Sequence, residues 1–83
     1  MVNSVIGNFI ETRKGKMVRI QFRKREAIEG VFIVTKDYEE MKTKNFWRIV
    51  TASKAGEWKS TKDPACARIF CGDEFAKLSD ITS

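Results

Sequence analysis

Residues 15–32 read GKMVRIQFRKREAIEGVF, and this stretch decides the fold class. Its first half predicts a strand over residues 16–23, because apolar and polar residues alternate there. The apolar positions are Val18, Ile20 and Phe22. After a polar turn, residues 27–35 predict a second strand with Gly30 in its middle. An interior glycine usually marks a bend or bulge, which a small sheet needs in order to close on itself.

Outward from this stretch, one helix and three further strands are expected. Residues 3–12 predict a short helix that Asn3 or Ser4 could cap and that Gly15 could end in a left-handed conformation. The remaining strands are expected at 46–51, 65–71 and 75–81, with a polar turn at 36–45, a long connection at 52–64 and a tight turn at 72–74. We therefore expect one mainly β domain over residues 1–83, a short N-terminal helix followed by a five-stranded, strongly bent antiparallel small barrel.

Strand parity predicts which side chains are buried. Val31 and Ile33 have the opposite parity to Phe32, so part of the second strand should be covered on both faces. In the third strand, Phe46 is expected in the core, because one face of that strand must be buried. Parity leaves open whether Trp47 and Trp58 are core residues or exposed aromatic platforms.

Composition argues against catalysis. The chain has 83 residues, no histidine and a formal net charge of +5. The carboxylate pairs Glu39-Glu40 and Asp73-Glu74 lie in polar turns, where desolvation cannot shift a pKa as acid–base chemistry requires. Cys66 and Cys71 lie five apart, which would place them on opposite faces of one strand, and there is no histidine or second cysteine pair to complete a zinc site. We predict no enzyme, no cofactor, no metal and no small-molecule substrate.

The chain carries neither a recognisable signal peptide nor an apolar run of membrane-spanning length. These features predict a cytoplasmic protein without a membrane partner.

Basic residues gather in two groups, and aromatic residues interleave with the second. The first group surrounds the first strand and includes Lys14; from it, Arg19, Arg23 and Arg25 are predicted to contact phosphates. From the second group, Lys44, Trp47 and Arg48 are predicted to form another nucleic-acid contact surface. Trp58 is predicted to bind a partner from an exposed loop.

The quoted stretch resembles the first motif of the Sm and Sm-like family, in which a helix leads into an alternating strand, a charged turn and a strand with a fixed glycine. Gly30 matches that glycine, although Arg25 stands where the turn usually has one. Residues 69–78 resemble the second motif, with Gly72 matching the glycine of its Arg-Gly pair and Cys71 replacing the arginine.

The resemblance implies an Sm-like barrel and rings built by pairing edge strands, here 46–51 and 75–81. It does not bring the family's uridine pocket. If Asp37 is the first residue of the pocket motif, Glu39 stands where the family has its stacking residue and Met41 where it has an asparagine. If Lys36 is the first residue instead, Tyr38 could stack on a base, but Lys36 and Glu40 stand where the family has an aspartate and an asparagine.

Two functions follow as hypotheses. The first is a non-enzymatic module that binds RNA or single-stranded DNA with weak sequence preference and forms a homo-oligomer, in the manner of a ring. The alternative is a protein–protein interaction or assembly module of the same fold with no nucleic-acid role, which docks a partner at Trp58 or at an edge strand.

Overall fold

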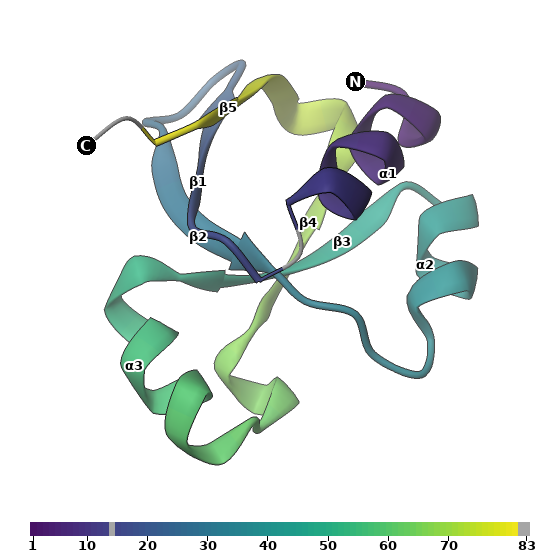
Figure 1. Cartoon of the computed structure of the whole chain (residues 1–83). Helices are drawn as coiled ribbons and strands as arrows, with labels where there is room; N and C mark the ends of the chain where they lie inside the picture. The colour runs from purple at the N-terminus through teal and green to yellow at the C-terminus, as the bar shows by residue number, and fades with distance from the viewer. Residues whose placement is uncertain (14, 82–83) are drawn as a thin grey trace.

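A computed structural model describes residues 1–13 and 15–81, so the expectations that involve Lys14 lie outside the described residues (Figure 1). One sheet and the helices around it make up the fold. Along the chain the elements are α1 (Asn3–Thr12), β1 (Val18–Phe22), β2 (Ile28–Phe32), α2 (Tyr38–Thr43), β3 (Phe46–Thr51), α3 (Ala52–Thr61), the 3₁₀ turn η1 (Pro64–Cys66), β4 (Arg68–Cys71), the 3₁₀ turn η2 (Gly72–Glu74) and β5 (Phe75–Asp80).

The five strands form a single antiparallel sheet in the order β4-β3-β2-β1-β5. This arrangement confirms the predicted N-terminal helix and the five antiparallel strands. The edges are β4 and β5. The expectation that residues 46–51 form an edge was wrong, because β3 pairs with β2 on one side and with β4 on the other.

The sheet changes its pairing partner at Gly30. Residues 28–30 of β2 face β1, whereas residues 30–32 face β3. A Cβ at Gly30 would lie 2.7 Å from Ile49 Cγ2 and 2.8 Å from the carbonyl oxygen of Val50. Only a residue without a side chain therefore allows β2 and β3 to approach this closely.

The sheet is also strongly curved. In a flat sheet β1 and β4 would lie roughly 14 Å apart, three strand spacings. Nevertheless, the ring of Phe22 on β1 and the ring of Phe70 on β4 have centroids 5.5 Å apart. The sheet remains open within the described residues, since β4 and β5 pair with β3 and β1 and not with each other.

The main core fills the concave side of this sheet and is covered by α1. Ile6 and Ile10 of α1 join it, and the ring of Phe32 lies edge-on to the rings of Phe75 and Trp47. The other buried members are Val18, Ile20, Phe22, Ile49 and Phe70. Gly15 has the predicted left-handed conformation, with φ +73°, but it does not end α1, which stops at Thr12 with Arg13 as its C-cap. The N-cap residue is Val2 without a side-chain cap, so the expected Asn3 or Ser4 cap was wrong.

A second, smaller core lies on the opposite side of β2 and β3. Val31, Ile33 and Val50 are buried there, and the half-buried Trp58 of α3 packs against them. The prediction that β2 is covered on both faces is confirmed. Figure 1 shows α1 and α3 on opposite sides of the sheet.

Two helices replace segments that were expected to lack regular structure. The segment 36–45 contains α2, and 52–64 contains α3 and part of η1. None of the residues in α2 is buried, and in α3 only Ala55 is buried. Helices that bury so little carry no apolar stripe, and this stripe is the signal by which a helix is recognised in a sequence.

In β3 the predicted parity was inverted. Phe46 is 40% exposed, whereas Trp47 is 2% exposed. Burial of the Trp47 indole is possible because its Nε1 donates a 2.8 Å hydrogen bond to Asn45 Oδ1. Asn45, at φ 60°, also donates from Nδ2 to the Met1 carbonyl, so one side chain joins the start of β3 to the start of the chain.

The close approach at Gly30 generates a stability prediction. Replacing Gly30 with alanine should lower the free energy of unfolding by about 1–3 kcal/mol, because the methyl group overlaps β3. The matched control is Gly56→Ala in the exposed part of α3, where a Cβ meets no atom within 4 Å. Because alanine favours a helix more than glycine does, this control should raise the free energy of unfolding by about 0.5–1 kcal/mol. Urea denaturation measures both. Equal effects of the two substitutions would contradict the crowding at Gly30.

Candidate functional site

Among residues 1–13 and 15–81, five ion pairs neutralise part of the charged surface. They are Arg13–Asp80, Arg19–Glu29, Lys44–Glu40, Arg48–Asp37 and Lys54–Glu57. The cations of the β1–β2 turn, Arg23, Lys24 and Arg25, have no carboxylate partner within 4.0 Å among the residues described. Because exposed ion pairs leave little net field, the unpaired cations decide where an anion would be attracted.

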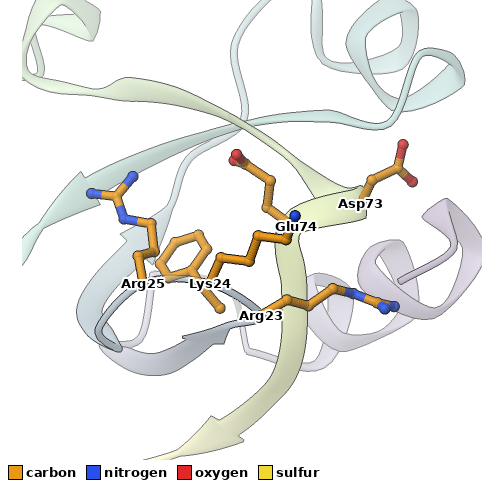
Figure 2. A pocket seen from close by; sticks show the side chains of 6 residues that line it. Arg23, Lys24, Arg25, Asp73 and Glu74 are labelled. Carbon is orange, nitrogen blue, oxygen red and sulfur yellow. The ribbon is translucent and has the colours of Figure 1, made fainter.

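The unpaired turn cations line a hollow of about 580 Å³, which we call the turn hollow. Its lining residues are Phe22, Arg23, Lys24, Arg25, Asp73 and Glu74. Figure 2 shows the three cationic side chains fanning out from the turn, with Asp73 and Glu74 coming from the neighbouring η2 segment. The Arg23 amide donates a 2.9 Å hydrogen bond to the Glu74 carbonyl, so the backbones of the turn and η2 are held together.

Arg25 is positioned by aromatic rings. Its guanidinium carbon lies 5.0 Å from the centroid of Phe22 and 5.7 Å from that of Phe70. Both rings belong to the main core and are almost fully buried. Cation–π attraction to a rigid core therefore orders a side chain that is otherwise exposed.

The predicted phosphate-binding set is only partly brought together. Arg23 and Arg25 line the same hollow, and Lys24 between them joins it. Arg19 lies elsewhere, on the outer face of β1, where its Nη1 is 3.9 Å from Glu29 Oε2 on β2. It lines none of the hollows described here.

The second predicted surface, Lys44, Trp47 and Arg48, is also divided. Lys44 and Arg48 line a hollow of about 380 Å³ beside edge strand β4, which we call the edge hollow. Its other lining residues are Asp37, Glu40, Met41, Phe46 and Ile69. Trp47 faces the core, so its predicted role as a surface contact was wrong. Phe46, its neighbour, presents an exposed ring in its place.

Arg48 is held by Asp37. Its Nη2 donates a 2.8 Å hydrogen bond to Asp37 Oδ2, and the Thr35 hydroxyl donates to Asp37 Oδ1. The hydrogen bond from Arg48, followed by that from Thr35, lowers the pKa of Asp37 from its ordinary value. Arg48 Nε is buried and has no acceptor among the described residues.

Trp58 lies on α3 and not on an exposed loop as expected. It lines a hollow of about 700 Å³, which we call the Trp58 hollow. The other lining residues are Ile33, Val34, Thr35, Lys36, Asp37, Arg48, Lys62 and Pro64. Lys62 Nζ lies 4.0 Å from the centroid of the Trp58 ring. Lys36 belongs to neither of the two basic groups read from the sequence, whereas Lys62 belongs to the second group but was not predicted to contact Trp58. That contact could have been predicted once a helix was assigned, because Lys62 follows Trp58 by four residues.

The residues that would correspond to the family's uridine pocket have other roles here. Asp37 is bound to Arg48 and Thr35, and the ring of Tyr38 packs against that of Trp47 with centroids 6.0 Å apart. Burial of Tyr38 raises the pKa of its hydroxyl. Cys71 is a free thiol on β4, and Cys66 is free in η1.

Residues 1–13 and 15–81 contain neither a metal-binding cluster nor a membrane-spanning helix. No group of three or more His, Cys, Asp or Glu side chains there could hold a metal ion. No helix in the same residues combines the length and apolar character needed to cross a membrane.

The Arg48–Asp37 pair generates a pH prediction. Arg48→Met should raise the pKa of Asp37 towards its ordinary value, as measured by ¹³C NMR titration of the carboxyl group. Because the folded-state pKa is lowered, the pair stabilises the fold above the unfolded-state pKa of Asp37, about 3.9, and this contribution is lost as the pH falls through the folded-state pKa.

Arg13→Met is the matched control for this titration. Arg13 lowers the pKa of Asp80 in the same way, so its loss should move Asp80 and leave Asp37 unchanged. An unchanged Asp37 pKa in Arg48→Met would show that the pair does not form in solution.

Comparison with known proteins gives no match: no family model, no curated protein and no solved structure is significantly similar to this chain. No relative therefore supplies a role for any of these side chains.

Proposed function

We propose that the protein is a non-enzymatic module that binds RNA or single-stranded DNA and self-associates. The observation that carries this proposal is the turn hollow, where three consecutive cations lack an ion-pair partner among the described residues and one of them is aligned on aromatic rings. Guanidinium and ammonium groups arranged in this way are suited to phosphate oxygens.

The same geometry argues for weak sequence preference. Backbone phosphates are common to all sequences, so contacts from Arg23, Lys24 and Arg25 carry no base information. Asp73 and Glu74 on the opposite wall reduce the positive charge of the hollow. The two carboxylates should keep the affinity modest. Because the contacts are made to phosphates, binding should weaken strongly as the salt concentration rises.

For the fold, we propose an Sm-like small barrel. In support, α1 leads into the alternating strand β1, a charged turn follows, and Gly30 of β2 lies where the strand changes partner. Phe22 and Phe70 meet across the curved sheet as a barrel-like interior requires. The altered positions at Asp37, Tyr38 and Cys71 argue that a uridine-specific inner pocket is not part of the proposal.

Self-association is proposed to use the two sheet edges. The Gly72 amide donates a hydrogen bond to the Asn45 carbonyl. On the other side of β3, the Ile33 amide donates a hydrogen bond to the Arg48 carbonyl. Hydrogen-bonded and non-hydrogen-bonded residue pairs alternate along an antiparallel ladder. The amide and carbonyl groups of Ile69 and Cys71 therefore point away from β3. Unpaired groups on an exposed edge favour pairing with another strand, and β5 of a second copy offers a complementary edge.

A second candidate function is a protein-interaction module without a nucleic-acid role. The exposed side chains of Phe46 and Ile69 beside edge strand β4 favour it, because an extended peptide could add to this edge and place apolar side chains in the edge hollow. Binding of a protein partner that survives high salt would support this candidate over the first.

The main test measures binding of a labelled, mixed-sequence single-stranded RNA at several salt concentrations. Replacing Arg23, Lys24 and Arg25 together with alanine should weaken binding about tenfold or more at low salt. It should also reduce the slope of log K against log salt by about 2, since each phosphate contact on a single strand contributes about 0.7.

The control replaces Lys16, Lys54 and Lys59 with alanine, which removes the same charge from exposed positions that line none of the three hollows. Equal losses in the two triple variants would mean that net charge alone drives binding. Absence of binding by the unmodified protein at low salt would refute the proposed function.

A separate test addresses the edge. Ile69→Pro removes an amide that β3 does not use, so the monomer should fold while the assembly weakens. Light scattering should give the mass of a multimer for the unmodified protein and a lower mass for Ile69→Pro. Ile69→Val, which keeps the amide and the apolar side chain, is the control. An unchanged mass in the proline variant would refute pairing through β4.

A further inference from the structure

The Trp58 hollow lies away from the turn hollow. Figure 1 places α3 and the β1–β2 turn at opposite ends of the molecule. The Trp58 hollow lies between the connection that follows β2 and the end of α3, with Lys36, Arg48, Trp58 and Lys62 among its lining residues. A nucleic acid bound at the turn would not by itself occupy it.

The lining of this hollow has a surplus of positive charge. It includes three cations, Lys36, Arg48 and Lys62, and one carboxylate, Asp37, which is already bonded to Arg48 and Thr35. Lys36 and Lys62 have no carboxylate within 4.0 Å in the part of the chain that the structure describes. A ligand that enters this hollow therefore meets two ammonium groups whose charge is not neutralised by a neighbouring carboxylate.

Trp58 gives the hollow a flat aromatic surface. The ring packs against Val31, Ile33 and Val50, so its position is fixed from the sheet side. The Lys62 ammonium lies 4.0 Å from its centroid, and the Lys62 amide donates a 2.7 Å hydrogen bond to the Trp58 carbonyl. The ring and the cation are thus joined by both backbone and side chain.

We infer that the Trp58 hollow binds one nucleotide of a single strand, with the base stacked on Trp58 and the adjoining phosphate held by Lys62 and Lys36. The inference rests on the proposed function and adds a second contact site to it. Lys62 exchanges one favourable contact for another, because its ammonium leaves the ring as the base arrives and binds the phosphate instead. Aromatic stacking and nearby cations are together the usual means of holding a single strand without reading its sequence.

The chain provides its own optical probe. Trp47 is 2% exposed and bonded to Asn45, whereas Trp58 is half-buried and lines the hollow. Titration with a short oligothymidylate should therefore quench the fluorescence of Trp58 and leave that of Trp47. In Trp58→Phe, which retains only Trp47, the quenching should disappear while binding of the labelled oligonucleotide remains within a few-fold.

The decisive variant is Trp58→Leu, which covers Val31, Ile33 and Val50 with an apolar group but cannot stack. Its affinity for the oligonucleotide should fall about tenfold or more relative to Trp58→Phe, with circular dichroism confirming that both variants are folded. Lys62→Gln provides a test that leaves the aromatic residue intact. It should reduce the salt slope by about 0.7, the contribution of one phosphate contact.

The possible outcomes separate this inference from the proposed function. If the unmodified protein does not bind the oligonucleotide, the proposed function fails and the inference fails with it. If it binds, but without quenching and with equal affinity in Trp58→Leu and Trp58→Phe, only the Trp58 site is refuted. Quenching together with a selective loss in Trp58→Leu would support it.

Discussion

The arrangement of the whole molecule depends on the close approach of β2 and β3 at Gly30. At this residue β2 ends its pairing with β1 and begins its pairing with β3, and the nearest atoms of Ile49 and Val50 leave no room for a side chain. The resulting curvature brings Phe22 and Phe70 together from strands that a flat sheet would keep apart. A short chain thereby encloses a core that it could not build from a flat sheet and one helix.

Covering both faces of the sheet restricts where a partner can bind. Helix α1 covers one face and α3 shields part of the other, so a partner can reach the ends of the sheet, its edges and the uncovered outer face around Arg19. The turn hollow lies at one end and the Trp58 hollow at the other, while the edge hollow lies beside β4. In both end hollows a cation lies over an aromatic ring that the core holds in place, Arg25 over Phe22 and Lys62 over Trp58.

Where the sequence predicts this structure well, the physical signal is local. Strict alternation located β1, and apolar spacing located α1 with its actual bounds. Helices α2 and α3 could not be found, because they bury almost nothing and so have no periodic pattern. The inverted parity of β3 has a different cause: both of its faces carry large apolar residues, and the hydrogen bond from Trp47 to Asn45 that decides between them is a tertiary contact.

The candidate site follows the same division. Arg23 and Arg25 were grouped correctly because they share one turn and are neighbours in any fold. Arg48 and Trp58 line a common hollow only because α3 folds back over β2 and β3, which no local pattern indicates. The two edges of the sheet, finally, are unlike each other, so assembly through β4 and β5 would be head-to-tail, without a twofold axis. Such a contact closes on itself only if the rotation between successive copies divides a full circle, and otherwise continues as a filament. The curvature that Gly30 permits would then help to determine how many copies complete a closed assembly.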